Sequence, residues 1–165
     1  MLKRILPSGF FICAGVLSIA AASAAVDQED VTKVRKKTDF RESLLKKFFK
    51  DNHCPAEKYS GLFLKEADEH GLDWRLLPSL SFVESGGGRV TRNNNIFGWA
   101  NGKHKFDSIS EAIHHVAAVL SQGKHYRGKD LEAKLFAYNR RASYSQTILS
   151  LMSRIAPDPS ADATE

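Results

Sequence analysis

The 165-residue sequence predicts a mainly helical fold built around one domain. Apolar residues recur at helical spacing in several stretches between residues 40 and 155. Two segments have the Ser-x-x-Glu/Gln pattern of a capping box, and glycines follow two of the apolar stretches, where they can end a helix. Only the Asn-Gly pair at 101–102 carries a strong hairpin signal. We therefore expect about six helices and one small β-hairpin.

Two amphipathic helices are expected at the start of this domain. The segment 40–52 places its large apolar residues on one helical face, and Pro55 then suits the first turn of the next helix. That second helix is expected to end at Gly71. The two apolar stripes consist of Phe40, Leu44, Leu45, Phe48 and Phe49, and of Tyr59, Leu62, Phe63 and Ala67.

A third helix and the hairpin are expected in the middle of the chain. Asp73 is the expected N-cap of a helix over 74–85, with Pro78 near its first turn, where a missing N–H costs least. A polar loop follows, and the segment 95–106 then predicts two short strands joined by the Asn-Gly turn.

The last part of the domain predicts three more helices. Ser108 and Glu111 form a capping box that opens one of them. Another helix is expected over roughly 129–139. Ser143 and Gln146 form the second capping box, which opens the final helix.

The two ends of the chain are expected to lie outside the domain, which spans 39–155. Residues 1–25 have the parts of a signal peptide: bases at positions 3 and 4, an apolar run, and a small-residue cleavage site at 22–24. An uncleaved anchor is the alternative, but Pro7 to Gly9 interrupts the apolar run. We expect a charged arm over 26–38 and a disordered tail over 156–165. The chain is therefore expected to be exported, to the periplasm, the cell wall or the medium, as a monomer without a stable membrane anchor.

The net charge of the chain favours one class of partner, and its cysteines predict no disulfide. The formal net charge is +5 at pH 7, which favours an anionic partner. For an exported protein a cell-wall polymer is the expected partner, and nucleic acid is not. Cys13 would leave with the signal peptide, so that Cys54 is expected to remain as a buried apolar residue without a disulfide.

Glu84 is the candidate acid of the sequence, in the stretch LLPSLSFVESGGGR. In helical register it lies beside Leu77 and Leu80, at the border of the core face. Partial burial there would favour its protonated form, and a protonated carboxyl group can donate a proton to a leaving glycosidic oxygen. The three glycines at 86–88 can end the helix and also admit a bulky ligand. The alternative is a water-exposed or paired glutamate at a helix end.

The segments ESGGGR and NNNIFGW resemble those of the bacterial N-acetylglucosaminidases that hydrolyse peptidoglycan, in the lysozyme-like superfamily. FAYN is similar to a segment of lytic transglycosylases, a sister group. The resemblance implies an α+β lysozyme-like fold, a β-1,4-glycosidic substrate in the peptidoglycan glycan strand, and catalysis by Glu84. The residues expected to bind the glycan are Ser85, Asn95, Phe97, Gly98, Trp99, Tyr138 and Tyr144.

The spacing of acids favours chemistry with one carboxyl group. No Asp or Glu occurs between Ser85 and Phe106, and the next acid, Asp107, precedes a helix cap. The substrate's 2-acetamido group is therefore expected to stabilise the positive charge, with water attack aided by Asp107 as the competing route. A lytic transglycosylase and a non-catalytic wall-binding module remain alternatives. No cofactor or metal is expected, because the six histidines form no H-E-x-x-H motif.

Overall fold

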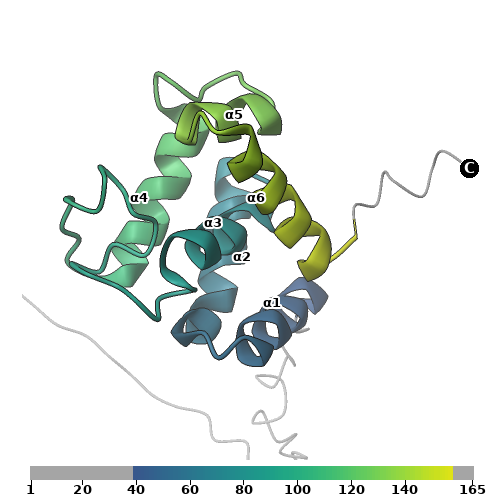
Figure 1. Ribbon diagram of the computed structural model, residues 1–165. Helices are drawn as coiled ribbons and strands as arrows, with labels where there is room; N and C mark the ends of the chain where they lie inside the picture. Colours follow the sequence, from purple (N-terminus) through teal and green to yellow (C-terminus); the bar gives the residue numbers. More distant parts are fainter. Residues whose placement is uncertain (1–38, 158–165) are drawn as a thin grey trace, which may run out of the picture. The chain divides into compact units, whose positions relative to one another are not determined.

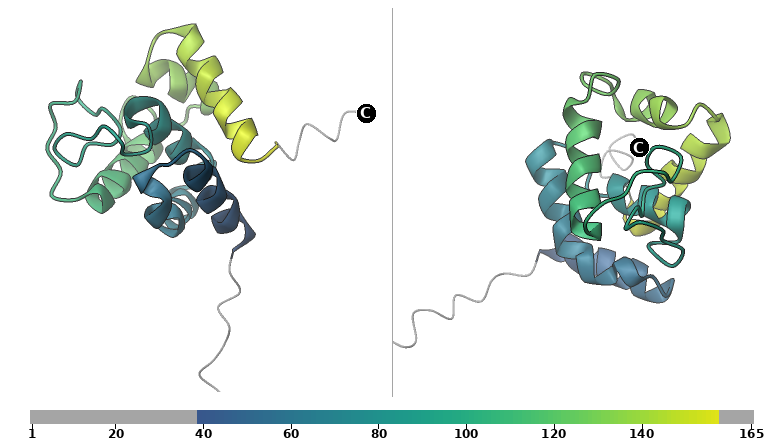
Figure 2. Two further views of the ribbon diagram at one scale, coloured as in Figure 1. Left: turned by 60° about the horizontal axis from the view of Figure 1, so that its bottom comes forward. Right: turned by 90° about the vertical axis from the view of Figure 1, so that its left-hand side faces the viewer.

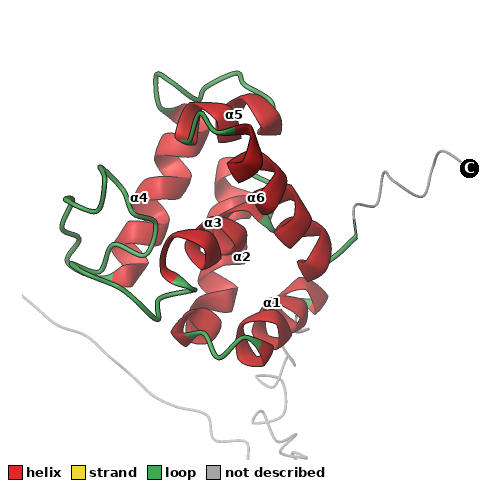
Figure 3. Cartoon of the chain, viewed as in Figure 1, coloured by secondary structure: helices red, strands yellow, loops and turns green. Residues whose placement is uncertain are grey.

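The computed structural model describes residues 39–157, and this part of the chain is mainly helical, as the sequence predicts (Figure 3). The expected signal peptide, the arm over 26–38 and residues 158–165 of the tail lie outside the described residues. Between residues 39 and 157, no helix has the length and apolar character needed to cross a bilayer. The helices are α1 (Phe40–Asp51), the 3₁₀ helix η1 (Pro55–Tyr59), α2 (Ser60–His70), α3 (Leu76–Ser85), α4 (Ile109–Gln122), α5 (Leu131–Tyr138) and α6 (Ala142–Ile155).

Several predicted helix ends are confirmed, because they depend on local groups. Pro55 occupies the first turn of η1, and Gly71 ends α2 in the left-handed conformation with φ 60°. Ser108 caps α4, where its hydroxyl accepts the backbone N–H of Glu111. The Glu111 carboxylate accepts the N–H of Asp107, one residue before the position that a standard capping box uses.

Two predicted helix starts are wrong. Asp73 does not cap α3: its carboxylate accepts the N–H of Arg75 at 2.9 Å and closes a turn, after which the helix begins at Leu76. Ser143 does not cap α6, since that helix begins at Ala142 and Arg141 precedes it without a side-chain cap. A serine already inside the first turn cannot accept the N–H that a capping residue would take.

The hairpin expected over 95–106 is not confirmed, because the described residues contain no strand. Three consecutive residues, Ala100, Asn101 and Gly102, have positive φ, so the chain coils here instead of extending. The N–H of Gly102 donates to the carbonyl of Gly98 at 2.9 Å, within the same turn. The Asn-Gly pair therefore makes a tight turn, but no paired strands flank it.

The core forms around α3, which lies in the middle of the other helices (Figure 1). Every residue from Leu76 to Ser81 is buried. A chain of aromatic rings joins α1, α2 and the loop after α3: Phe49 stacks on Phe63 at 5.6 Å, and Phe63 meets Phe97 edge-on at 6.5 Å. Burial of rings this large contributes much of the stability of a domain of this size.

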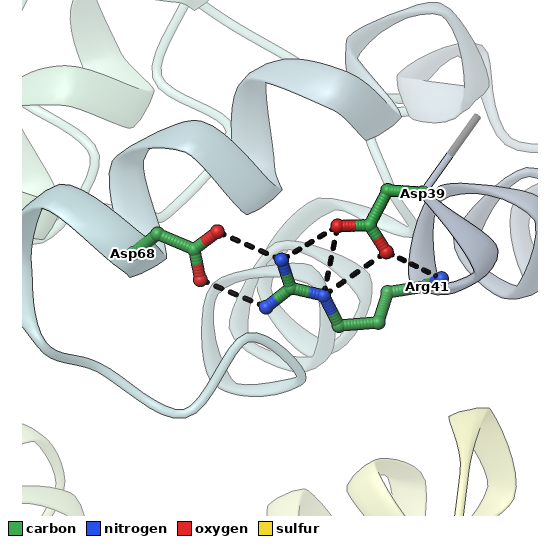
Figure 4. Close-up of polar contacts among 3 residues, drawn as sticks. All are labelled: Asp39, Arg41 and Asp68. Atoms are coloured by element: carbon green, nitrogen blue, oxygen red, sulfur yellow. Dashed lines mark hydrogen bonds and ion pairs between the residues drawn. The ribbon is translucent and has the colours of Figure 1, made fainter. Parts of the chain in front are cut away.

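Polar contacts fasten α1 to α2 at the surface. The guanidinium of Arg41 lies between the carboxylates of Asp39 and Asp68, and binds Asp68 through two hydrogen bonds of 2.8 Å (Figure 4). Hydrogen bonds from Arg41 lower the pKa of Asp39 and of Asp68 from their ordinary value. These pairs are solvent-exposed, so they orient α1 more than they stabilise the fold.

Candidate active site

Glu84 projects from the last turn of α3 at the surface of the domain. The helix ends directly after it, because Gly86 takes the left-handed conformation with φ 63°. The side chain is exposed, and the expected partial burial is therefore wrong. The reason is that Glu84 follows the buried part of the helix, on a turn that neighbouring helices no longer cover.

Two tyrosines from the end of the chain reach Glu84 and the loop beside it. The hydroxyl of Tyr144, on α6, donates to Oε1 of Glu84 at 2.6 Å. The hydroxyl of Tyr138, on α5, donates to the carbonyl of Phe97. Burial raises the pKa of both phenols well above the ordinary value, and the nearby Glu84 carboxylate raises them further. Both hydroxyls therefore stay protonated and act as hydrogen-bond donors.

Gly98 fits closely against the second oxygen of Glu84. A Cβ atom at Gly98 would lie 2.7 Å from Oε2, inside the contact distance that two such atoms tolerate. Gly98 also has a φ of +61°, a conformation in which other residues are strained. The absence of a side chain at this position therefore lets the loop approach the carboxylate.

Trp99, Tyr138 and Tyr144 form a row of aromatic rings that leads to Glu84. The ring centroids of Trp99 and Tyr138 are 5.9 Å apart, and those of Tyr138 and Tyr144 are 6.0 Å apart with nearly parallel planes. All three rings are partly exposed. Such rings combine an apolar face with a polar edge, which suits contact with sugar rings.

Two hollows are lined by residues of this row or by their neighbours in sequence, and the loop after α3 lies beside α4 (Figure 1 and Figure 2, left). One hollow, of about 350 Å³, is lined by Gly98, Trp99 and Tyr138 among others. The other, of about 700 Å³, is lined by residues of α3 and α6 that include Val83, the neighbour of Glu84. Glu84 lines neither hollow, but its Oε2 lies against Gly98 of the first, and Val83 of the second precedes it in the chain. Neither lining includes a carboxylate.

Three residues that the sequence predicts to bind the glycan instead support the loop from inside the domain. Phe97 is completely buried in the core. The Ser85 hydroxyl donates to the carbonyl of Ile96 at 2.8 Å, and the Asn95 side chain pairs with the backbone of Trp99 in both directions. Ser85 and Asn95 are 5 % exposed, so their polar groups are used to hold the loop rather than to face a ligand.

The glycines after Glu84 also have a structural role. All three have positive φ, between 63° and 89°. A Cβ at Gly87 would lie 2.7 Å from Cβ of Cys54, and the Gly87 carbonyl accepts the N–H of Ala56. Gly87 thus ties the end of α3 to η1. Cys54 is buried as predicted, and burial raises the pKa of its thiol.

The first hollow and its support include residues beyond the predicted site. Ala100 and Asn101 line the hollow, as does Tyr126 from the segment between α4 and α5. His115 of α4 packs against Trp99 with ring centroids 5.8 Å apart. Burial lowers the pKa of this histidine, so that its neutral form is favoured. No local pattern marks His115, since it meets Trp99 only through the fold.

Of the eight predicted site residues, five come together in space: Glu84, Gly98, Trp99, Tyr138 and Tyr144. The other three support this group from the core. The chain matches no protein-family model, no curated protein and no solved structure. Its function is therefore inferred from its own residues.

Proposed function

We propose that this chain is a glycosidase that cleaves a β-1,4 bond in the glycan strand of peptidoglycan, with Glu84 as the general acid. The observation that carries the proposal is the placement of Glu84: an exposed carboxyl group that accepts a hydrogen bond from Tyr144 at the end of a row of aromatic rings, and that lies against Gly98 of the first hollow. The resemblance of the segments around Glu84 and the 93–99 loop to glucosaminidases supports a lysozyme-like domain. The small hairpin expected in that fold is not part of the proposal.

The two oxygens of Glu84 have different surroundings, which suits proton donation. Oε1 accepts a hydrogen bond from Tyr144, whereas Oε2 lies against Gly98, at the wall of the first hollow. In the proposed reaction Oε2 carries the proton and passes it to the bridging oxygen as the glycosidic bond breaks. Tyr144 remains the donor to Oε1 throughout and stabilises the carboxylate that results.

The missing second carboxylate points to help from the substrate. The linings of the two hollows near Glu84 contain aromatic, aliphatic, small and neutral polar residues and one base, Arg154, but no acid. Asp107, the competing candidate, belongs to the start of α4, where its N–H pairs with Glu111. The 2-acetamido group of an N-acetylated sugar can stabilise the positive charge that develops at C1, after which water completes hydrolysis.

The test is digestion of purified peptidoglycan, with mass spectrometry of the fragments. Wild type is expected to release fragments with reducing-end N-acetylglucosamine, and Glu84→Gln to release them about 10²–10⁴-fold more slowly. Glu69→Gln, at an exposed glutamate of α2, is the matched control and is expected to behave as wild type. Equal digestion by wild type and Glu84→Gln would overturn the role of Glu84.

Two other outcomes would indicate a different function. Anhydro-muramyl ends would show a lytic transglycosylase, in which the 6-hydroxyl of the sugar replaces water. Retained binding to peptidoglycan without any product would show a non-catalytic wall-binding module. Peptidoglycan lies outside the cytoplasm, so export of the chain belongs to the same proposal. Cell fractionation with an antibody against the chain tests it, and a chain found only in the cytoplasm would contradict it.

A further inference from the structure

A buried carboxylate on α2 lies among basic groups, apart from the residues that surround Glu84. The side chain of Glu66 is 3 % exposed, although acidic residues are almost never fully buried unless they are paired. Its Oε2 lies 2.8 Å from Nδ1 of His114 and 3.6 Å from Nε2 of His70. The ammonium group of Lys65 lies 3.7 Å from Oε1, on a side chain that is largely exposed.

The three side chains meet because of how α2 and α4 are arranged. Glu66 and His70 are four residues apart on α2, so they project from the same helical face. His114 comes from α4, 48 residues farther along the chain. One possible ligand atom of each residue lies within 4.8 Å of those of the other two.

These distances are close to those of a metal site. Zinc binds imidazole nitrogen and carboxylate oxygen at about 2.0–2.2 Å, which puts neighbouring ligand atoms of a tetrahedral site about 3.3 Å apart. The separations of 2.8 Å and 3.6 Å from Oε2 lie on either side of that value. The side chain of His114 is 64 % exposed, so it has room to rotate and adjust.

We propose that Glu66, His70 and His114 form a binding site for Zn²⁺ or a similar divalent transition-metal ion, with water in the fourth position. Two imidazoles and one carboxylate suit such ions, whereas Ca²⁺ and Mg²⁺ prefer ligand sets made only of oxygen. The ion offsets the charge of the buried carboxylate. Lys65, which is on the exposed side, swings into solvent when the ion binds.

The bound ion links α2 to α4, and this has a consequence for the rest of the domain. α4 also carries His115, which packs against Trp99 at the wall of the first hollow. A metal link at His114 therefore fixes the helix that supports this wall. The site has a structural role in this proposal, and it does not depend on the proposed function of Glu84.

The test is zinc titration of the tag-free full chain after treatment with EDTA. Calorimetry at pH 7.5 is expected to show one site per chain. Zinc at about 100 times the dissociation constant is expected to raise Tm by about 5–10 °C. Mg²⁺ at the same concentration is expected to leave Tm unchanged.

Matched histidine variants locate the site. His114→Gln removes a ligand from a mostly exposed position, so the fold is retained. It is expected to weaken zinc binding by more than the about 10–100-fold that loss of a group supporting a ligand costs. His125→Gln, at an exposed histidine outside the cluster, is expected to bind zinc as wild type does.

Two results would overturn the proposal. Wild type and His114→Gln with equal zinc affinity would exclude these residues as ligands. A wild-type Tm that does not respond to zinc, together with a metal-free Tm that falls in His114→Gln, would show that Glu66 and His114 form an ion pair only.

Discussion

Two glutamates on neighbouring helices have opposite surroundings, although both are in contact with ring-bearing side chains. Glu84 is exposed at the end of α3, and a tyrosine hydroxyl donates to it. Glu66 is buried on α2, and two imidazoles approach it. In the proposed mechanism, the Tyr144 hydroxyl stabilises the carboxylate that forms when Glu84 gives up its proton. The imidazoles beside Glu66 offer nitrogen atoms that can bind a cation together with the carboxylate.

The comparison shows that the partner of a carboxylate decides its chemistry as much as its burial does. Burial was a property expected to favour the protonated form of Glu84, and Glu84 is not buried. The buried glutamate is Glu66, whose partners suit a metal ion. Exposure at Glu84 has its own use, because a long polymer can reach an acid only at the surface.

The largest expected effect comes from exchanging each glutamate for glutamine. Glu84→Gln is expected to lower the rate of glycan cleavage by about 10²–10⁴-fold, the contribution of a general acid, and to keep the zinc-dependent rise in Tm. Glu66→Gln is expected to lose that rise. Product release by mass spectrometry and thermal melts with and without zinc measure the two effects. Loss of the zinc-dependent rise in Tm in Glu84→Gln would contradict the assignment of separate roles to the two glutamates.

Substitutions at Gly87 and Gly98, two glycines near Glu84, are expected to affect different properties. The first lowers the stability of the domain, and the second lowers glycan cleavage. Gly87→Ala places Cβ against buried Cys54 and is expected to destabilise the domain by about 3 kcal/mol, from overpacking and left-handed strain together. For Gly98→Ala the three atoms nearest the new Cβ all belong to the exposed side chain of Glu84, so the substitution is expected to cost about 1 kcal/mol of strain. Its main effect is to displace the carboxylate and lower cleavage.

Gly128→Ala is the matched control for this pair. Gly128 has φ +74° and no atom within 4 Å of the position of a Cβ, so the substitution adds strain without a collision. Urea unfolding and glycan cleavage are measured for all three variants. Similar unfolding midpoints for Gly87→Ala and Gly128→Ala would show that the contact with Cys54 does not matter.

A smaller effect is expected from removing the hydroxyl that holds Glu84. Tyr144→Phe keeps the ring and removes the 2.6 Å hydrogen bond to Oε1. A hydrogen bond to a charged group contributes about 1.5–3 kcal/mol, so cleavage is expected to fall about 10–100-fold. Since Glu84 is exposed, the unfolding midpoint is expected to change little. A rate equal to that of wild type would remove Tyr144 from the mechanism.

The smallest expected effect is a loss of stability in alkaline solution. In the folded state the pKa values of Tyr138 and Tyr144 are raised, mainly by burial. In the unfolded chain the pKa of tyrosine is about 10. Below that pH both states keep the protons and stability is unaffected. As pH rises above it, the unfolded chain loses protons first, so the free energy of unfolding falls.

Urea unfolding at pH 8 and at pH 10.5 measures this fall. The Tyr138→Phe, Tyr144→Phe double variant is expected to lose less stability between the two pH values than wild type does, because it no longer has these two phenols. If the two proteins lost equal stability between these pH values, ionisation of Tyr138 and Tyr144 would not contribute to the pH dependence of stability.

Local features of the sequence were sufficient to predict the helices and several of their ends. The stop at Gly71 and the cap at Ser108 depend on neighbouring backbone groups and are confirmed. The cap at Ser143 is wrong, since the chain enters α6 earlier. The hairpin is not confirmed, because Asn95 binds the carbonyls of Trp99 and His104 and holds the segment in turns.

The candidate site could be predicted only in part, because burial is not visible in a short motif. Gly98, Trp99 and Tyr144 lie near Glu84 as expected, but Phe97 belongs to the core. The motif that marks the loop does not show which of its residues face inward. His115, which supports Trp99, carries no local signal.

The sequence by itself determined the helical class of the described domain and singled out Glu84, because periodicity, caps and glycine steps act over a few residues. Only the tertiary structure decided which groups touch each carboxylate. Tyr144 reaches Glu84 across 60 residues, and His114 reaches Glu66 across 48. Contacts over such separations depend on how helices pack, and helix packing is set by the summed burial of many side chains rather than by any one motif.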